Sequence, residues 1–234
     1  MNSLITNTEN LALVEQRIRA AEKTSGRSNN SVQLIGASKK HSAMTAQHFF
    51  AAGLKNFGEN YVDEAIAKQS ELTHLDITWH FIGPIQSNKT KAIAQNFSWV
   101  HSVDRWKIAQ RLNQHRASQA LPEALNIPIQ VNLDNEASKH GVSIEELPSL
   151  AKAIGELEHL TLRGLMAIPK PQPSFDTQRH SLMRLQTLQT QLNQTLPVHL
   201  DTLSAGMSSD LEAAIAAGST MVRIGTDLFG QRPD

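Results

Sequence analysis

The sequence contains no cysteine. It can therefore form no disulfide, offer no thiol nucleophile and bind no metal through thiolates, and it suits a reducing compartment. None of its ten histidines falls in an HExxH pattern or in comparable ligand spacing, so we expect no metal site. The nucleotide-binding patterns G-x-x-x-x-G-K-[ST] and G-x-G-x-x-G are also absent, so nucleotide binding is unsupported.

The chain also lacks an excess of charge and a long apolar run. Its 22 basic residues balance 22 acidic ones, so it has no electrostatic signature of binding to nucleic acid or to an anionic membrane. No stretch approaches the length of a membrane span, and residues 1–7 do not resemble a secretion signal. We therefore expect a cytoplasmic protein that binds neither nucleic acid nor membranes.

The sequence does contain a regular alternation of short apolar runs and segments with helical periodicity. The expected strands are residues 32–39, 56–58, 78–83, 99–103, 127–133, 160–168, 199–203 and 220–224. Eight such units in 234 residues predict one α/β domain over residues 1–234, a (β/α)₈ barrel with an extra N-terminal helix. A doubly wound parallel sheet is the alternative, because periodicity cannot decide whether a parallel sheet closes.

Two loops near the end of the chain are rich in glycine and small hydroxyl residues. They contain Ser204, Gly206, Ser208 and Ser209 after the seventh expected strand, and Gly225 and Thr226 after the eighth. In a barrel, these two loops commonly bind phosphate through backbone N–H groups and hydroxyls. Two ordinary strand-to-helix turns are the alternative. Ser209 and Glu212 also have the spacing of a capping box for the following helix.

Lys39 ends the first expected strand. An amine at the mouth of a barrel is partly desolvated, which lowers its pKa and makes it a candidate Schiff-base nucleophile. The alternative is a lysine that merely extends into solvent from the strand end. If a phosphate site faces the same mouth, a phosphate ester that carries an aldehyde is the natural ligand, and pyridoxal 5′-phosphate is the obvious one.

Arg223 ends the eighth expected strand and could face the ring nitrogen of that cofactor. A guanidinium keeps its proton and disfavours a protonated pyridinium beside it, so the ring would be a poor electron sink. Carbanion chemistry at an amino-acid Cα would then be slow. A structural ion pair is the alternative role for Arg223.

Several longer motifs resemble those of one family. They are residues 37–39 (ASK), 56–61 (NFGENY), 79–89 (WHFIGPIQSNK), 164–169 (GLMAIP), 204–210 (SAGMSSD) and 222–226 (VRIGT). In this order, over nearly the whole chain, they resemble the pyridoxal phosphate homeostasis protein family, whose bacterial branch is usually called YggS. That family is similar in fold to the barrel domain of alanine racemase and lacks the second, β-rich domain of the racemase.

The resemblance implies a carrier or regulator of intracellular pyridoxal 5′-phosphate, which is held as a Schiff base on Lys39. We expect Lys39 rather than Lys40 to react, because Lys39 directly follows Ala37 and Ser38 as in the family. The resemblance further implies that Ser204, Ser208, Gly225 and Thr226 hold the phosphate, that Arg223 faces the pyridine nitrogen, and that Asn60, His80, Met166 and Met207 line the pocket. The sequence departs from the residues usual in the family at Lys40, His41, Ala205 and Asp227.

Racemisation needs two acid/base groups, one on each face of the substrate carbanion. Lys39 supplies one, and in alanine racemase a tyrosine from the partner's second domain supplies the other. The single tyrosine of this chain, Tyr61, is expected to pack at the start of a helix. We therefore expect a monomer without established catalytic activity, with apo-enzymes that depend on the cofactor as candidate recipients. A weak racemase or lyase is the alternative function, and a Schiff-base aldolase is a third.

Overall fold

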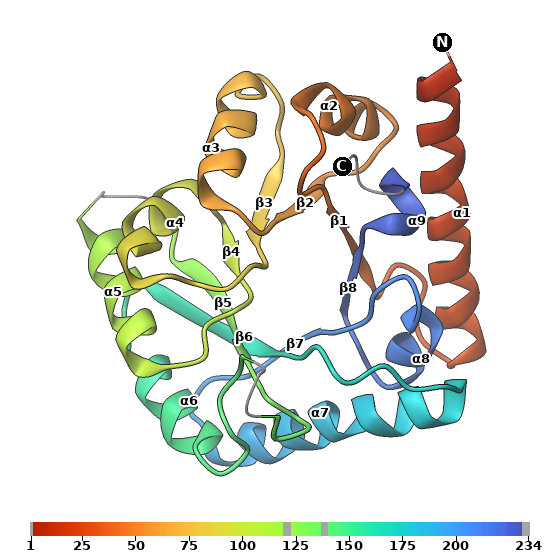
Figure 1. Ribbon diagram of the computed structural model, residues 1–234. Coiled ribbons are helices and arrows are strands. Elements are labelled where there is room, and N and C mark those ends of the chain that lie inside the picture. The colour runs from red at the N-terminus through yellow and green to blue at the C-terminus, as the bar shows by residue number, and fades with distance from the viewer. Residues whose placement is uncertain (1, 119–122, 137–139, 231–234) are drawn as a thin grey trace.

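Eight parallel strands close into a barrel in which each strand pairs with its neighbours in sequence and β1 pairs with β8 (Figure 1). The computed structural model describes residues 2–118, 123–136 and 140–230. The strands are β1 (Gln33–Ala37), β2 (Asn56–Glu59), β3 (Thr78–Phe81), β4 (Trp99–Val100), β5 (Leu125–Gln130), β6 (Leu160–Met166), β7 (Thr202–Ser204) and β8 (Met221–Ile224). The predicted (β/α)₈ barrel is confirmed, and the alternative of an open, doubly wound sheet is wrong.

Helices surround the barrel on its outside (Figure 1). They are α1 (Asn2–Thr24), α2 (Ala43–Ala51), α3 (Val62–Glu71), a 3₁₀ turn (Ser87–Lys89), α4 (Thr90–Asn96), α5 (Trp106–Ala117), α6 (Leu147–Gly155), α7 (Phe175–Thr195), α8 (Leu211–Ala216) and α9 (Thr226–Phe229). Within the described ranges, no helix combines the length and the apolar character needed to cross a membrane.

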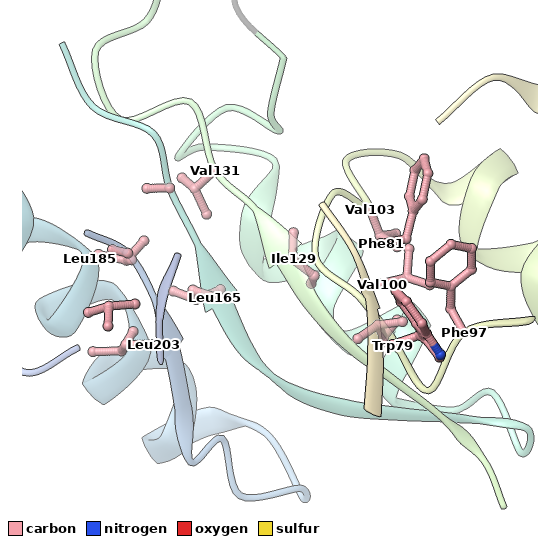
Figure 2. Close-up of a cluster of buried hydrophobic side chains, with 14 of the residues drawn as sticks. Trp79, Phe81, Phe97, Val100, Val103, Ile129, Val131, Leu165, Leu185 and Leu203 are labelled. Atoms are coloured by element: carbon pink, nitrogen blue, oxygen red, sulfur yellow. The ribbon is translucent and has the colours of Figure 1, made fainter. Parts of the chain in front are cut away.

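The main hydrophobic core fills the layer between the strands and the surrounding helices. Phe81 of β3 packs edge-on against Phe97, with the ring centroids 5.3 Å apart, in the cluster that Figure 2 shows. Both rings are buried, as are Ile129 of β5 and Leu185 of α7. Fully burying a side chain of this size contributes roughly 1.5–3 kcal/mol. This layer fixes the outward-facing residues of the strands and thereby sets which residues face the barrel interior.

The predicted N-terminal helix lies beside α8 and α9, on the side of the barrel where β8 runs (Figure 1). Its buried residues Leu11, Val14 and Ile18 follow helical spacing and form one apolar stripe. Asn10 Nδ2 donates a hydrogen bond to the Leu228 carbonyl of α9 (3.0 Å). The extra helix thus covers the two elements that follow the C-terminal loops.

Candidate functional site

A cavity of about 520 Å³ opens at the end of the barrel where the strands finish. This volume lies within the range of small-molecule binding sites. The residues that line the cavity belong to strand ends, to the loops that follow them and to α9 with its C-cap: Ala37, Lys39, His41, Asn60, Ile82, Ile168, Met207, Ser208, Ser209, Arg223, Gly225, Thr226, Asp227 and Gly230. In a barrel of this class, functional sites lie at this end of the strands.

Lys39 lies in a tight turn that directly follows β1. The amide of His41 donates to the Ser38 carbonyl (3.1 Å), and Lys40 has a left-handed backbone conformation with a φ of 65°. The Lys40 amide donates to Glu64 Oε1 of α3 (2.5 Å), and the Lys40 side chain is exposed. Lys39 lines the cavity, whereas Lys40 is not among the lining residues. The turn therefore separates the two neighbouring amines.

A buried cluster of polar groups lies beside this turn. Lys68 Nζ of α3 donates to Glu59 Oε1 (2.5 Å) and to the Ser38 carbonyl (2.8 Å). The Ser38 hydroxyl donates to the same Glu59 oxygen (2.6 Å). Burial raises the pKa of Glu59, and the charge of Lys68 opposes that rise. These bonds fix the main chain immediately before Lys39.

The loops after β7 and β8 lie next to each other at the cavity. The amide of Asp227 donates to the Ser208 hydroxyl (3.4 Å), which links the second loop to the first. Gly206 has a φ of +102°, and a Cβ at this position would lie 2.6 Å from the Ala214 Cβ, so the first loop requires glycine here.

The predicted capping box of Ser209 and Glu212 is wrong. The N-cap residue of α8 is Asp210, and its Oδ1 accepts a hydrogen bond from the Met207 amide (2.6 Å) instead of capping the helix. Glu212 is bound by Arg17 of α1 (2.7 Å) and so does not return to the start of its own helix. Because Arg17 binds Glu212 and Asp210 occupies the N-cap position, Ser209 and Glu212 do not form the predicted capping box.

Arg223 is buried in β8 and reaches the cavity. Its Nη1 donates to the carbonyl and the hydroxyl of Ser204 (both 2.7 Å), and its Nη2 donates to the Ala167 carbonyl (3.1 Å). These partners are neutral oxygens and not the carboxylate of an ion pair. Burial lowers the pKa of Arg223 to about 10, so the guanidinium stays charged at neutral pH.

Three of the predicted pocket residues, His80, Met166 and Ser204, are buried and are not among the residues that line the cavity. His80 Nδ1 lies 3.0 Å from His101 Nε2, and His101 Nδ1 lies 2.8 Å from the Ser204 hydroxyl. The far ring nitrogen of His80 lies 3.1 Å from Asn56 Oδ1. A chain of hydrogen bonds thus leads from Asn56 through His80, His101 and Ser204 to Arg223. Ser204 is its last link, because it accepts hydrogen bonds from the Arg223 guanidinium.

The other seven predicted residues do meet at the cavity: Lys39, Asn60, Met207, Ser208, Arg223, Gly225 and Thr226. Their roles as cofactor ligands stay predictions. The sequence reasoning missed Ala37, His41, Ile82, Ile168, Asp227 and Gly230, although all of them except Gly230 lie at a strand end or within four residues of one. Tyr61 was expected to pack, but its side chain is 52% exposed at the start of α3, outside the residues that line the cavity.

Two features of the cavity fit an organic ligand. Asn60 Oδ1 is buried and has no hydrogen-bond partner among the described residues. A Cβ added at Gly225 would meet only Ala37, at 3.6 Å, so the fold itself does not require glycine there and a ligand can approach the backbone. Together with the amine of Lys39 and the guanidinium of Arg223, this set of groups suits a small anion that carries an aldehyde.

The chain matches the family described as "Alanine racemase, N-terminal domain" over residues 10–233. The solved alanine racemase of Clostridium difficile 630 superposes with a TM-score of 0.76 at 15% sequence identity, over 100% of this chain and 58% of the racemase. At that identity the likeness shows the fold alone. The fold and the cavity at its open end therefore define a barrel of the alanine racemase N-terminal class.

Relatives with higher sequence identity show which family within this class the chain belongs to. A pyridoxal phosphate homeostasis protein of Pseudomonas aeruginosa is 53% identical over 227 residues, which cover 97% of this chain and 96% of the relative. Its counterpart in Escherichia coli K12 is 46% identical over 226 residues, 95% of each chain. The solved structure of PipY from Synechococcus elongatus with PLP bound is 37% identical, with a TM-score of 0.85 over 96% of this chain and 100% of PipY. The chain belongs to the pyridoxal phosphate homeostasis protein family.

Proposed function

We propose that this protein binds pyridoxal 5′-phosphate in the cavity at the open end of the barrel and serves its intracellular homeostasis as a carrier or regulator. The observation that carries the proposal is the meeting of Lys39, Arg223 and the two hydroxyl-bearing loops in one cavity. The names of the curated relatives and the cofactor in the PipY structure support it.

Each group of the cofactor has a proposed partner. The Nζ of Lys39 attacks the aldehyde carbon, water leaves, and a Schiff base forms. Ser208, Gly225 and Thr226 hold the phosphate, Arg223 faces the ring nitrogen, and Asn60 and Met207 complete the wall. When bound, the cofactor supplies an electrophilic carbon and a conjugated ring.

A carrier fits these residues better than an efficient racemase does. Arg223 stays protonated at neutral pH, which disfavours a proton on the ring nitrogen beside it and weakens the ring as an electron sink. Tyr61, a candidate second acid/base group, is exposed and lies outside the residues that line the cavity. The proposal extends to a cytoplasmic monomer that passes the cofactor to apo-enzymes, in keeping with the absence of cysteine and with the homeostasis role named for the relatives.

The test is reduction of the complex with borohydride, followed by fragment-ion sequencing of the modified peptide. We expect one cofactor adduct, on Lys39, and the Lys39→Ala variant is expected to lose the adduct at that position. Lys40→Ala is the matched control, because it removes the neighbouring exposed amine and should leave the Lys39 adduct intact. A wild-type protein that stays unmodified after cofactor and borohydride would refute the proposal.

A further inference from the structure

Arg17 of α1 connects the two loops that form one side of the cavity. Its Nε and Nη2 donate to the two carboxylate oxygens of Glu212 (2.7 and 3.1 Å), which lies in α8 after the first loop. Its Nη1 donates to Asp227 Oδ2 in the first turn of α9, directly after the second loop (2.5 Å). Nη2 also donates to the Ser208 carbonyl (3.2 Å). One guanidinium from outside the barrel thus binds both loops.

The charge of Arg17 matters because Asp227 lines the cavity. Its carboxylate directly follows Thr226, which the proposed function assigns to the phosphate. A carboxylate without a nearby cation would repel an anion bound in this cavity. Hydrogen bonding to Arg17 lowers the pKa of Glu212, and hydrogen bonding to Glu212 and Asp227 raises the pKa of Arg17, so the guanidinium keeps its charge at neutral pH.

We propose that Arg17 is a positioning residue for the phosphate of the cofactor: it neutralises Asp227 beside the phosphate and holds the Ser208 main chain against the second loop. This inference rests on the proposed function. It assigns the N-terminal helix a part in ligand selection, since the helix carries the cation that makes the cavity accept a doubly charged ester group.

The experiment compares two ligands that share a ring and an aldehyde. Pyridoxal 5′-phosphate carries the phosphate and pyridoxal does not, so their dissociation constants, measured by absorbance titration, separate effects on the phosphate from effects on the rest of the site. In Arg17→Met we expect the affinity for pyridoxal 5′-phosphate to fall about tenfold, because the uncompensated carboxylate of Asp227 then repels the phosphate across solvent-screened space. The affinity for pyridoxal should change by less than about twofold.

Three further variants sharpen the test. Arg17→Met combined with Asp227→Asn should recover most of the lost affinity, because the repelling carboxylate is gone. Asp227→Asn alone should bind pyridoxal 5′-phosphate more tightly than wild type, and its affinity for pyridoxal should not change. This variant keeps the inference testable if Arg17→Met folds poorly. Arg19→Met is the control: Arg19 lies on the same helix and is also ion-paired, but to Glu22 (2.8 Å), and it is not among the cavity residues.

The outcomes distinguish the inference from the function on which it rests. A wild-type protein that binds neither ligand contradicts the proposed function itself. Suppose that wild type binds both ligands. The inference is overturned if Arg17→Met binds pyridoxal 5′-phosphate as tightly as wild type does, or if its affinities for the two ligands fall by the same factor. A double variant that stays as weak as Arg17→Met would also overturn it, since neutralisation of Asp227 would then not be the cause.

Discussion

The fold leaves room for a side chain at Gly225. Its φ is negative, and an added Cβ would meet only Ala37 at an ordinary 3.6 Å. We expect Gly225→Ala to leave the free energy of unfolding without cofactor within about 0.5–1 kcal/mol of wild type, or slightly higher, because alanine restricts the unfolded chain. Binding of pyridoxal 5′-phosphate should weaken severalfold, because the methyl group occupies the space beside the backbone.

Gly206→Ala is the contrasting control. Urea unfolding measures the stability of both variants, and titration with pyridoxal 5′-phosphate measures their affinity for the cofactor. Gly206 has a left-handed φ, and its added Cβ would lie 2.6 Å from the Ala214 Cβ. We expect a loss of about 1–3 kcal/mol in unfolding free energy from the strain. A Gly225→Ala variant that binds the cofactor as tightly as wild type would show that the ligand does not approach the backbone at this position.

Individual site residues were predictable where their position follows from the end of a strand. Lys39 and Thr226 lie just past β1 and β8, and both reach the cavity as expected. His80 lies on a correctly predicted strand, whereas Ser204, which was predicted in the loop after the seventh strand, is the last residue of β7; both lie deeper in the molecule than the lining residues. Alternation along a strand predicts which face a side chain occupies, but not how far along the barrel axis it lies, because that depends on strand stagger.

At the scale of elements, α3 is tied to the barrel by a buried ion pair. Lys68 of α3 and Glu59 of β2 are 4% and 0% exposed, and their charged atoms lie 2.5 Å apart. Lys68→Met would leave Glu59 buried without its cation. We expect a loss of about 3–5 kcal/mol in unfolding free energy at neutral pH, the usual cost of removing one partner of such a pair.

This loss should depend on pH in a defined direction. Burial already raises the pKa of Glu59, and removal of Lys68 removes the charge that opposes the rise. The deficit of Lys68→Met should therefore shrink as the pH falls, because protonated Glu59 is less costly to bury. Urea unfolding at pH 8 and pH 5 measures this change, with Lys68→Met combined with Glu59→Gln as the control that removes both charges. An equal deficit at both pH values in Lys68→Met would contradict the assignment.

The elements themselves were largely predictable, and their ends were not. Apolar runs identified all eight strands, but β4 is only Trp99–Val100 where residues 99–103 were expected, and Val103 instead forms an isolated bridge with Ile129. The capping box at Ser209 failed because Glu212 is bound by Arg17, 195 residues away in sequence. Strand lengths and helix starts depend on such tertiary partners, which local periodicity does not contain.

At the scale of the whole molecule, the closed barrel has an unusually polar interior. The eight alternating units predicted the barrel, yet the sequence pattern alone could not separate a closed sheet from an open one. Inside the closed structure, His80, His101 and Ser204 form a buried chain that supports Arg223. The side chains that usually fill a barrel of this class are bulky and apolar. The polar chain makes the stability of the whole barrel sensitive to acid.

Burial lowers the pKa of His80 to about 3 and that of His101 well below its ordinary 6.5. Both rings are therefore neutral in the folded protein, whereas in the unfolded chain they bind protons once the pH falls below about 6.5. The unfolded state then binds more protons, so the barrel has its full stability above pH 6.5 and loses it as the pH falls toward 3. Each histidine contributes at most about 1.4 kcal/mol per pH unit to this loss.

His80→Gln should reduce the slope of unfolding free energy against pH between about pH 6 and pH 4 by close to one proton, whatever it does to absolute stability. Glutamine keeps a donor and an acceptor but does not titrate. Urea unfolding at several pH values measures the slope, and His74→Gln, which changes an exposed histidine, is the matched control that should leave it unchanged. If His80→Gln keeps the wild-type slope, His80 is not held neutral by burial, and the hydrogen-bonded chain beneath Arg223 must carry a charge.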